Sequence, residues 1–382
     1  MTITDNRIIT SRFAALNPRQ SILALAIIAS MILLSLWPTS AHVSGGNGVS
    51  QVPIAQKADL TNDDLRLYRQ INSRIASGTG YYAAAFAEQR INAYPTKPFV
   101  TVRFPTLAIA VASIGPQLAQ LLLVCGAFFT LYIWHMQLAG AFRDPGRRVS
   151  AVMLIASGLI MAVMSKYVVL HELWAGMLIA ISLGLYQPSR YWPAVIAAAL
   201  ALAVRETALP FILLMSAFAL FERRWREAAV WSILIVAFAL GLYWHATVVI
   251  SLAKPDDVTS LGWAQFGGWN AAITAMEKTS ALRILPSIFA TVFIPLSLFG
   301  WLSWRSGVGL RGTLYLAGYG IMLMLVGRPD NFYWGLMVTP LLLLGLAFLP
   351  QALLDIALNL GWQGEKKVAG PDLFHTNKSA PS

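Results

Sequence analysis

Charged residues are scarce in this chain, and their scarcity excludes most classes of soluble protein. Asp, Glu, Lys and Arg together make up 12% of the 382 residues, whereas soluble domains carry about 25%. Hydrophobic residues make up 57%, and the mean hydropathy is +0.62. Long apolar runs recur along most of the sequence, which is typical of a polytopic membrane protein. We therefore predict an all-α protein embedded in a lipid bilayer.

Cysteine and clustered metal ligands are also nearly absent. The single cysteine, Cys125, excludes an intramolecular disulfide, and its place in an apolar run predicts a small buried packing residue. The five histidines are scattered along the chain, so no metal site is predicted. A divalent cation at His171–Glu172 or at Asp256–Asp257 is the alternative, and a solvated turn is the simpler interpretation of the second pair.

The chain is basic, with a formal net charge of +11. No basic stripe with interleaved aromatic residues accompanies this charge, so nucleic acid is not an expected partner. In a membrane protein, excess Lys and Arg are better explained as residues that set the topology. The charge therefore supports the membrane assignment.

Ten apolar runs approach the length of a bilayer crossing. They lie near 21–37, 116–135, 149–165, 172–187, 191–204, 207–221, 228–250, 285–304, 311–326 and 332–349. We predict a tail over 1–20, a transmembrane domain over 21–349 and a second tail over 350–382. The first run is predicted to be a retained anchor, and a signal peptide cleaved near residue 41 is the alternative.

Basic residues fall in every second connection of this ten-span arrangement. They are Arg7, Arg12, Arg19, Arg143, Arg147, Arg148, Arg190, Arg223, Arg224, Arg226, Arg305, Arg311, Lys366, Lys367 and Lys378. The positive-inside rule then places both termini in the cytoplasm of a bacterial-type inner membrane. Two long segments, 38–105 and 251–284, fall on the periplasmic side.

The first periplasmic segment contains a predicted amphipathic helix. Leu65, Tyr68 and Ile71 recur at helical spacing, and Asp63 and Asp64 lie near the start of the helix. We expect this helix to lie along the membrane surface. Acidic residues at a helix N-terminus also interact favourably with the helix dipole, and this capping role is the alternative to a catalytic one.

Further ionisable residues occur where predicted spans end on the periplasmic side. They are Lys166, His171, Glu172, Arg205, Glu206, Arg328 and Asp330, and Arg103 lies in a Pro-rich connection before the second span. At such depths ionisable groups face a cavity or pair with each other, and snorkelling at helix ends is the alternative. Arg and Lys bind phosphate oxygens, and a carboxylate can act as a general base on a hydroxyl group. These residues fit a site for a lipid-borne phosphate.

Three features together carry a resemblance to a known family. One is the acidic cluster and tyrosine Asp63-Asp64-Leu-Arg-Leu-Tyr68, followed by Gly80 and an aromatic pair. The others are Arg205-Glu206 at the start of a span and the large first outer loop. In these features the chain resembles the GT-C superfamily of integral-membrane glycosyltransferases, which use polyprenyl-phosphate-linked sugars.

The resemblance implies roles for specific residues. Asp64, with Asp63 beside it, would be the catalytic base, although the family's more usual pair is Asp-Glu. Arg205, Arg328 and Lys166 would bind the lipid phosphate. The remaining expected substrate-binding residues are Arg103, Glu206, His171, Glu172, Asp330 and Tyr68.

The expected function is transfer of a sugar from a polyprenyl-phosphate donor to a glycan, lipid or protein acceptor at the periplasmic face. A multi-pass transporter or a flippase for lipid-linked substrates is the alternative. Transporters often contain repeated halves and charges near the bilayer midplane, whereas here no repeat is evident and the charges lie at span ends. A non-catalytic assembly protein is a third possibility, and it leaves the one-sided charges unexplained.

Overall fold

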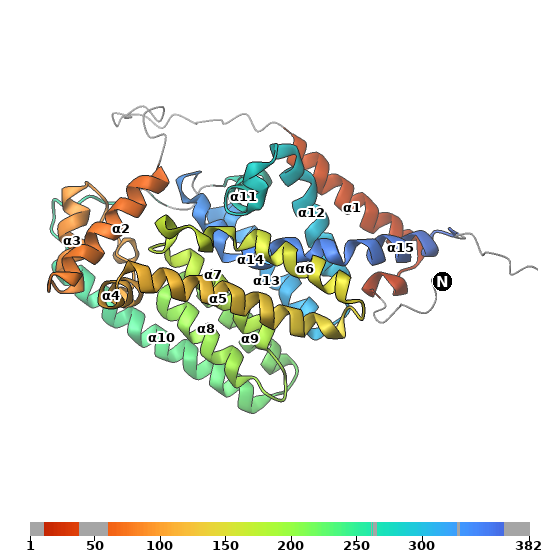
Figure 1. Cartoon of the computed structure of the whole chain (residues 1–382), viewed down its shortest axis with the longest axis horizontal. Coiled ribbons are helices and arrows are strands. Elements are labelled where there is room, and N and C mark those ends of the chain that lie inside the picture. Colours follow the sequence, from red (N-terminus) through yellow and green to blue (C-terminus); the bar gives the residue numbers. More distant parts are fainter. Residues whose placement is uncertain (1–10, 38–59, 261, 263–265, 327–328, 363–382) are drawn as a thin grey trace, which may run out of the picture.

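The chain folds into a bundle of helices in the computed structural model, which describes residues 11–37, 60–260, 262, 266–326 and 329–362 (Figure 1). Within these ranges there is no β-strand, and the only bridge pairs Lys97 with Thr259. Many of the helices are strongly apolar. The prediction of an all-α membrane protein is confirmed.

The helices follow one another with short connections. In chain order they are η1 (Arg12–Ala15), α1 (Pro18–Leu36), α2 (Leu60–Ala76), α3 (Tyr81–Ile91), η3 (Phe99–Thr101), α4 (Pro105–Ile114), α5 (Pro116–Gln137), η4 (Leu138–Gly140), α6 (Pro145–Gly158), η5 (Ile160–Val163), η6 (Ser165–Tyr167), α7 (His171–Leu185), α8 (Trp192–Val204), η7 (Glu206–Ala208), α9 (Leu209–Phe221), α10 (Trp225–Leu252), α11 (Gly268–Lys278), η8 (Ala281–Ile284), α12 (Ser287–Ser303), α13 (Gly307–Val326), η9 (Pro329–Met337), α14 (Thr339–Leu342), η10 (Leu343–Ala347) and α15 (Leu349–Asn359).

Four of the described helices are long and apolar enough to cross a bilayer: α1, α10, α13 and α5 extended through Gly140. A fifth candidate consists of Thr339–Ala347 and Leu349–Asn359, which are bent by 43° at the break. Several predicted spans instead correspond to apolar helices of 10–17 residues, namely α7, α8 and α12 together with Glu206–Phe221. These are shorter than the roughly 20 residues of a usual crossing.

One end of the bundle brings together connections that are far apart in the sequence. Arg12 Nη1 donates a hydrogen bond of 3.0 Å to the Leu302 carbonyl, and Arg311 Nη2 lies 2.8 Å from Glu222. Arg224 pairs with Glu227 at 2.8 Å. We call this end, formed by η1, the connections 138–145, 186–191, 222–224 and 304–306, and α15, the basic end. The start of α1 and α15 lie together at the right of Figure 1.

The other end of the bundle is formed by α2, α3 and α4 together with the end of α10 (Figure 1). The helix expected from the spacing of Leu65, Tyr68 and Ile71 is present as α2, and Leu65 and Ile71 are buried. Burial of such a side chain stabilises the fold by about 1.5–3 kcal/mol. Because α7 has 15 residues, about 22 Å separates its two ends.

The predicted span 332–349 is divided into η9, α14 and η10 because other helices approach its backbone very closely. A Cβ atom at Gly300 of α12 would overlap the Gly345 carbonyl, and one at Gly345 would overlap the Ser297 carbonyl. Small residues allow membrane helices to approach in this way. The segment is therefore a buried packing element of the bundle.

Three other expectations differ from the structure. Cys125 is exposed, on a surface of α5 that also exposes Leu122 and Phe129. Residues 350–359, assigned to a tail, form most of α15, in which Ala352 and Ile356 are buried. The run 149–165 is α-helical only to Gly158, and two 3₁₀ segments follow. A run of apolar residues does not by itself indicate which of them face lipid or where helix geometry ends.

Candidate functional site

The α2 helix supplies two polar residues to the same side of one cavity. Asp64 and Tyr68 are four residues apart, which places them on one helical face, and both line the cavity. Leu65 and Leu67, on either side of this face, are buried in two hydrophobic clusters. The apolar residues of α2 therefore hold the helix in an orientation that turns Asp64 and Tyr68 inward.

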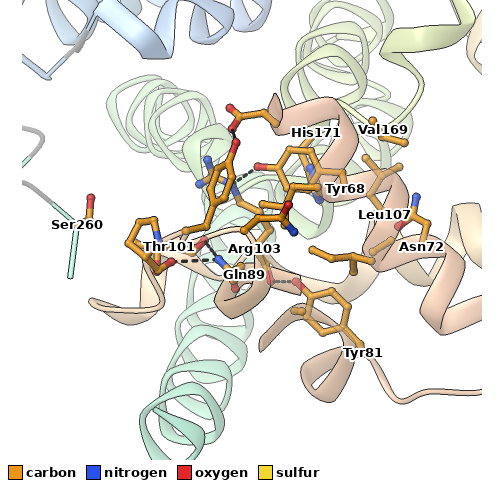
Figure 2. A pocket seen from close by; sticks show the side chains of 18 of the residues that line it. Tyr68, Asn72, Tyr81, Gln89, Thr101, Arg103, Leu107, Val169, His171 and Ser260 are labelled. Atoms are coloured by element: carbon orange, nitrogen blue, oxygen red, sulfur yellow. Dashed lines mark hydrogen bonds between the residues drawn. The ribbon is translucent and has the colours of Figure 1, made fainter. Parts of the chain in front are cut away.

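The cavity has a volume of about 220 Å³ and lies between α2, α3 and the start of α7 (Figure 2). Its charged lining residues are Asp64 and Arg103. Tyrosines and amides supply most of the remaining polar surface, and the whole lining comprises Asp64, Leu67, Tyr68, Ile71, Asn72, Tyr81, Ala85, Gln89, Asn92, Ala93, Tyr94, Pro95, Thr101, Arg103, Leu107, Ala108, Val169, His171, Ser260, Asn331 and Tyr333. Such a surface suits a ligand with many hydroxyl groups.

Asp64 is oriented by a tyrosine from the connection after α3. The Tyr94 hydroxyl donates a hydrogen bond of 2.7 Å to Oδ1 of Asp64. Burial raises the pKa of Tyr94, and the nearby Asp64 carboxylate raises it further. Tyr94 therefore stays protonated and remains a donor to the carboxylate at neutral pH.

Arg103 is held on the cavity wall by two partners. Its Nε atom donates a hydrogen bond of 3.2 Å to the Tyr68 hydroxyl, and its Nη1 atom lies 3.5 Å from Oε1 of Glu206. Burial raises the pKa of Tyr68, while the positive charge of Arg103 opposes that rise. The result is a fixed cation beside the carboxylate of Asp64 in one cavity.

Behind this wall lies a buried ion cluster. Arg205 is 1% exposed, its Nε atom lies 2.7 Å from Oε1 of Glu172, and its Nη1 atom contacts Glu206. Glu206 thus bridges Arg205 and Arg103. Arg205 does not line the cavity, so in this structure its charge is balanced by protein carboxylates.

His171, the first residue of α7, has unsatisfied polar atoms in the cavity wall. Its side chain is 3% exposed and lies edge-on to the Tyr68 ring, with centroids 5.2 Å apart. Neither ring nitrogen has a hydrogen-bond partner among the residues that the structure describes. The same is true of Nδ2 of Asn331. Buried polar atoms usually have partners, so these atoms are available to a ligand.

Other residues expected at the site lie elsewhere. The Asp63 side chain is 45% exposed and lies 3.6 Å from Arg66 on the outer surface of α2. Lys166 is exposed and stacks over the Tyr167 ring at 4.8 Å. Arg328 and the side chain of Asp330 lie outside the described residues.

Sequence reasoning did not identify Tyr94, Gln89 and Tyr81 as site residues, because these lay in a segment interpreted as a connection. Gln89 Nε2 donates to the Pro95 and Thr101 carbonyls at 3.1 and 3.2 Å and so holds the connection after α3 in place. The density of tyrosines and amides over 81–94 is the signal that could have indicated a polar wall.

The described residues contain no group of three His, Cys, Asp or Glu side chains that could hold a metal ion. Glu172 is paired with Arg205. Asp257, a second cation candidate, receives two hydrogen bonds from Arg90, of 2.7 and 2.8 Å. Both carboxylates therefore serve as partners of arginines in this structure.

The cavity thus combines a positioned carboxylate, a fixed guanidinium and unsatisfied polar atoms at one end of an apolar bundle. Comparison of the chain with protein-family models, with curated proteins and with solved structures finds no match.

Proposed function

We propose that this chain is a membrane glycosyltransferase that moves a sugar from a polyprenyl-phosphate donor to an acceptor hydroxyl group. The observation that carries the proposal is the presence of Asp64 and Arg103 in the same cavity. Glycosyl transfer needs a base for the acceptor and positive charge near the departing phosphate. Tyrosines and amides around these two residues can bind sugar hydroxyls.

In the proposed step the Asp64 carboxylate takes the proton of the acceptor hydroxyl, whose oxygen forms a bond to the anomeric carbon. The bond between that carbon and the phosphate oxygen breaks, and polyprenyl phosphate leaves with the electron pair. Arg103 stabilises the charge that develops on the phosphate. His171 and Asn331 can provide further hydrogen bonds to the donor.

The proposal gives Arg103, and not Arg205, the role of contacting the phosphate. Arg205 already pairs with Glu172 and Glu206, whereas Arg103 lines the cavity. Arg205 then acts as a positioning residue, because its contact with Glu206 fixes the carboxylate that holds Arg103.

We also propose that the short apolar helices cross the membrane together with the longer ones, giving about ten crossings. The basic end would then face the cytoplasm with both termini, and the cavity would face the periplasm of an inner membrane. Support comes from the separation of the two ends by whole helices, since α10 alone spans about 42 Å. Lys and Arg at the basic end agree with the positive-inside rule.

A transfer assay tests this function. Membranes that contain the chain are incubated with polyprenyl phosphates carrying radiolabelled hexoses or pentoses, and label in non-donor products is followed by chromatography. Asp64→Asn should lower transfer about 100-fold or more, the range expected for loss of a general base. The matched control is Asp63→Asn, which alters a surface carboxylate one residue away and should retain activity. Full activity of Asp64→Asn would exclude the proposed base.

A further inference from the structure

A second and larger cavity lies at the basic end of the bundle. Its volume is about 650 Å³, within the range of about 300–1,000 Å³ typical of small-molecule sites. Its walls come from η1, the connection before α6, the end of α12, and the junction of η10 with α15. The proposed glycosyl transfer makes no use of it.

The rim of this cavity carries opposite charges close together. Asp144 caps the N-terminus of α6, with Oδ2 accepting a hydrogen bond of 2.8 Å from the Arg147 backbone N–H. The Arg147 side chain is exposed and lines the cavity, as does Ser150 one helical turn further along. The first turn of α6 therefore offers a guanidinium, a hydroxyl and the positive end of a helix dipole for an anion.

Deeper in the cavity, an indole N–H has no partner. Trp304 is 3% exposed, and its Nε1 atom is buried without a hydrogen-bond partner in the described part of the chain. A buried unpaired donor carries a free-energy cost that a ligand acceptor would remove. Trp304 thus provides a second, independent indication of a ligand, separate from the start of α6.

The inner wall is aromatic and apolar. Phe348 stacks on Trp304, with ring centroids 4.5 Å apart, and on Phe142, with centroids 5.1 Å apart. Leu154 and Leu354 complete this surface. The cavity therefore has a polar rim and an apolar interior, as an amphiphile requires.

Apolar residues on the same helices are exposed beside the cavity. Val149 and Met153 of α6 are 47% and 62% exposed, and Leu353 of α15 is 41% exposed. In a membrane protein such side chains contact lipid. A bilayer lipid can therefore reach the cavity without leaving the membrane.

We propose that this cavity binds a bilayer phospholipid whose headgroup carries both a phosphate and an amine. Arg147 and Ser150 contact the phosphate, and the Asp144 carboxylate contacts the ammonium group. The glycerol region and the first acyl carbons pack on Phe142 and Phe348, where Trp304 donates to an ester oxygen. Opposite charges on Asp144 and Arg147 favour a zwitterionic headgroup over an anionic one.

Lipid-induced thermal stabilisation tests this proposal. The purified full chain in detergent is titrated with phosphatidylethanolamine, and the melting temperature is followed by intrinsic tryptophan fluorescence. Arg147→Gln should weaken the apparent affinity about tenfold, as expected for loss of a charged hydrogen bond. The matched control is Arg143→Gln, in the same connection but outside the cavity lining, which should respond as the wild type does. Trp304→Phe keeps the aromatic stack, removes the N–H and should also weaken the response.

Other ligands distinguish the sources of the same chemistry. Soluble phosphoethanolamine should give little stabilisation, because it lacks the apolar part, and phosphatidylglycerol should be weaker than phosphatidylethanolamine. Equal responses to soluble phosphoethanolamine would overturn a lipid ligand, and equal responses to phosphatidylglycerol would overturn the role of Asp144. An unchanged titration of Arg147→Gln would overturn the site itself. Asp64→Asn should respond as the wild type does, so failure of the proposed transferase function leaves this test intact.

Discussion

The hydroxyl of Tyr94 donates a hydrogen bond of 2.7 Å to the carboxylate of Asp64, although 30 residues separate them in the sequence. Tyr94 lies after α3 and Asp64 lies near the start of α2. The bond therefore fixes the carboxylate relative to both helices. If Asp64 is the base, Tyr94 is its positioning residue.

Tyr94→Phe should lower sugar transfer about tenfold while leaving donor binding nearly unchanged. The reason is that a hydrogen bond to a charged group is worth about 1.5–3 kcal/mol, and its loss misplaces the carboxylate without removing a donor contact. Initial rates at varied donor concentration separate kcat from KM. Tyr132→Phe, at an exposed site on α5, is the control. A tenfold rise in KM with unchanged kcat would instead make Tyr94 a donor-binding residue.

Arg205→Gln should destabilise the fold strongly. The substitution leaves the carboxylates of Glu172 and Glu206 without their arginine partner. Removal of one partner from a buried ion pair costs about 3–5 kcal/mol. Denaturant titration in detergent micelles measures this change. Arg66→Gln removes an exposed arginine from a surface pair and should cost at most about 1 kcal/mol; similar losses in both variants would contradict the importance of the buried cluster.

Acid should weaken the attachment of the loop after α10 to α3. Two hydrogen bonds from Arg90 lower the pKa of Asp257 in the folded protein. Their stabilisation is therefore complete above the ordinary Asp pKa of about 3.9. It is lost as the pH falls through the lower native pKa, because the unfolded state then binds the proton more readily.

Melting temperatures measured from pH 7 to pH 2 check this effect. Asp257→Asn should lower the melting temperature at pH 7 and flatten its decline in acid. Asp256→Asn, at an exposed neighbouring position, should keep the wild-type profile. Identical profiles for all three proteins would show that the Arg90–Asp257 pair contributes nothing to stability.

Gly300→Ala should destabilise the bundle by about 1–3 kcal/mol, the usual effect of overpacking. A Cβ atom at this position would overlap the Gly345 carbonyl. The matched control is Gly241→Ala in α10, where no described atom lies within 4 Å of the added Cβ. That substitution should be neutral or slightly stabilising, because Ala favours helix over Gly. Thermal unfolding of both variants would contradict the packing account if Gly300→Ala matched the wild type.

The fold class and the position of α2 could be predicted from sequence because both depend on local pattern. The apolar runs indicated a membrane protein, and the spacing of Leu65, Tyr68 and Ile71 indicated the buried face of α2. The division of 332–349 could not be predicted in this way. It depends on the approach of Gly300 to Gly345, which is a tertiary contact.

The candidate site was predictable in its residue types but not in its pairings. Sequence indicated that Asp64, Arg103 and Glu206 belong to one end of the bundle, and these side chains do lie together in or beside one cavity. The partners of Asp64 and Arg205 depend on packing between helices that are distant in sequence. Adjacent residues such as Asp63 and Asp64 therefore have different environments, which no local pattern distinguishes.

The most direct test of the central claim is binding of polyprenyl phosphate, compared with the phosphate-free polyprenol, to the purified chain and to Arg103→Gln. Microscale thermophoresis in detergent measures both affinities. The account predicts that wild type prefers the phosphate-bearing lipid and that Arg103→Gln loses this preference while still binding polyprenol weakly. Equal binding of the two lipids by wild type, or no binding of either, would contradict a lipid-phosphate site beside Asp64.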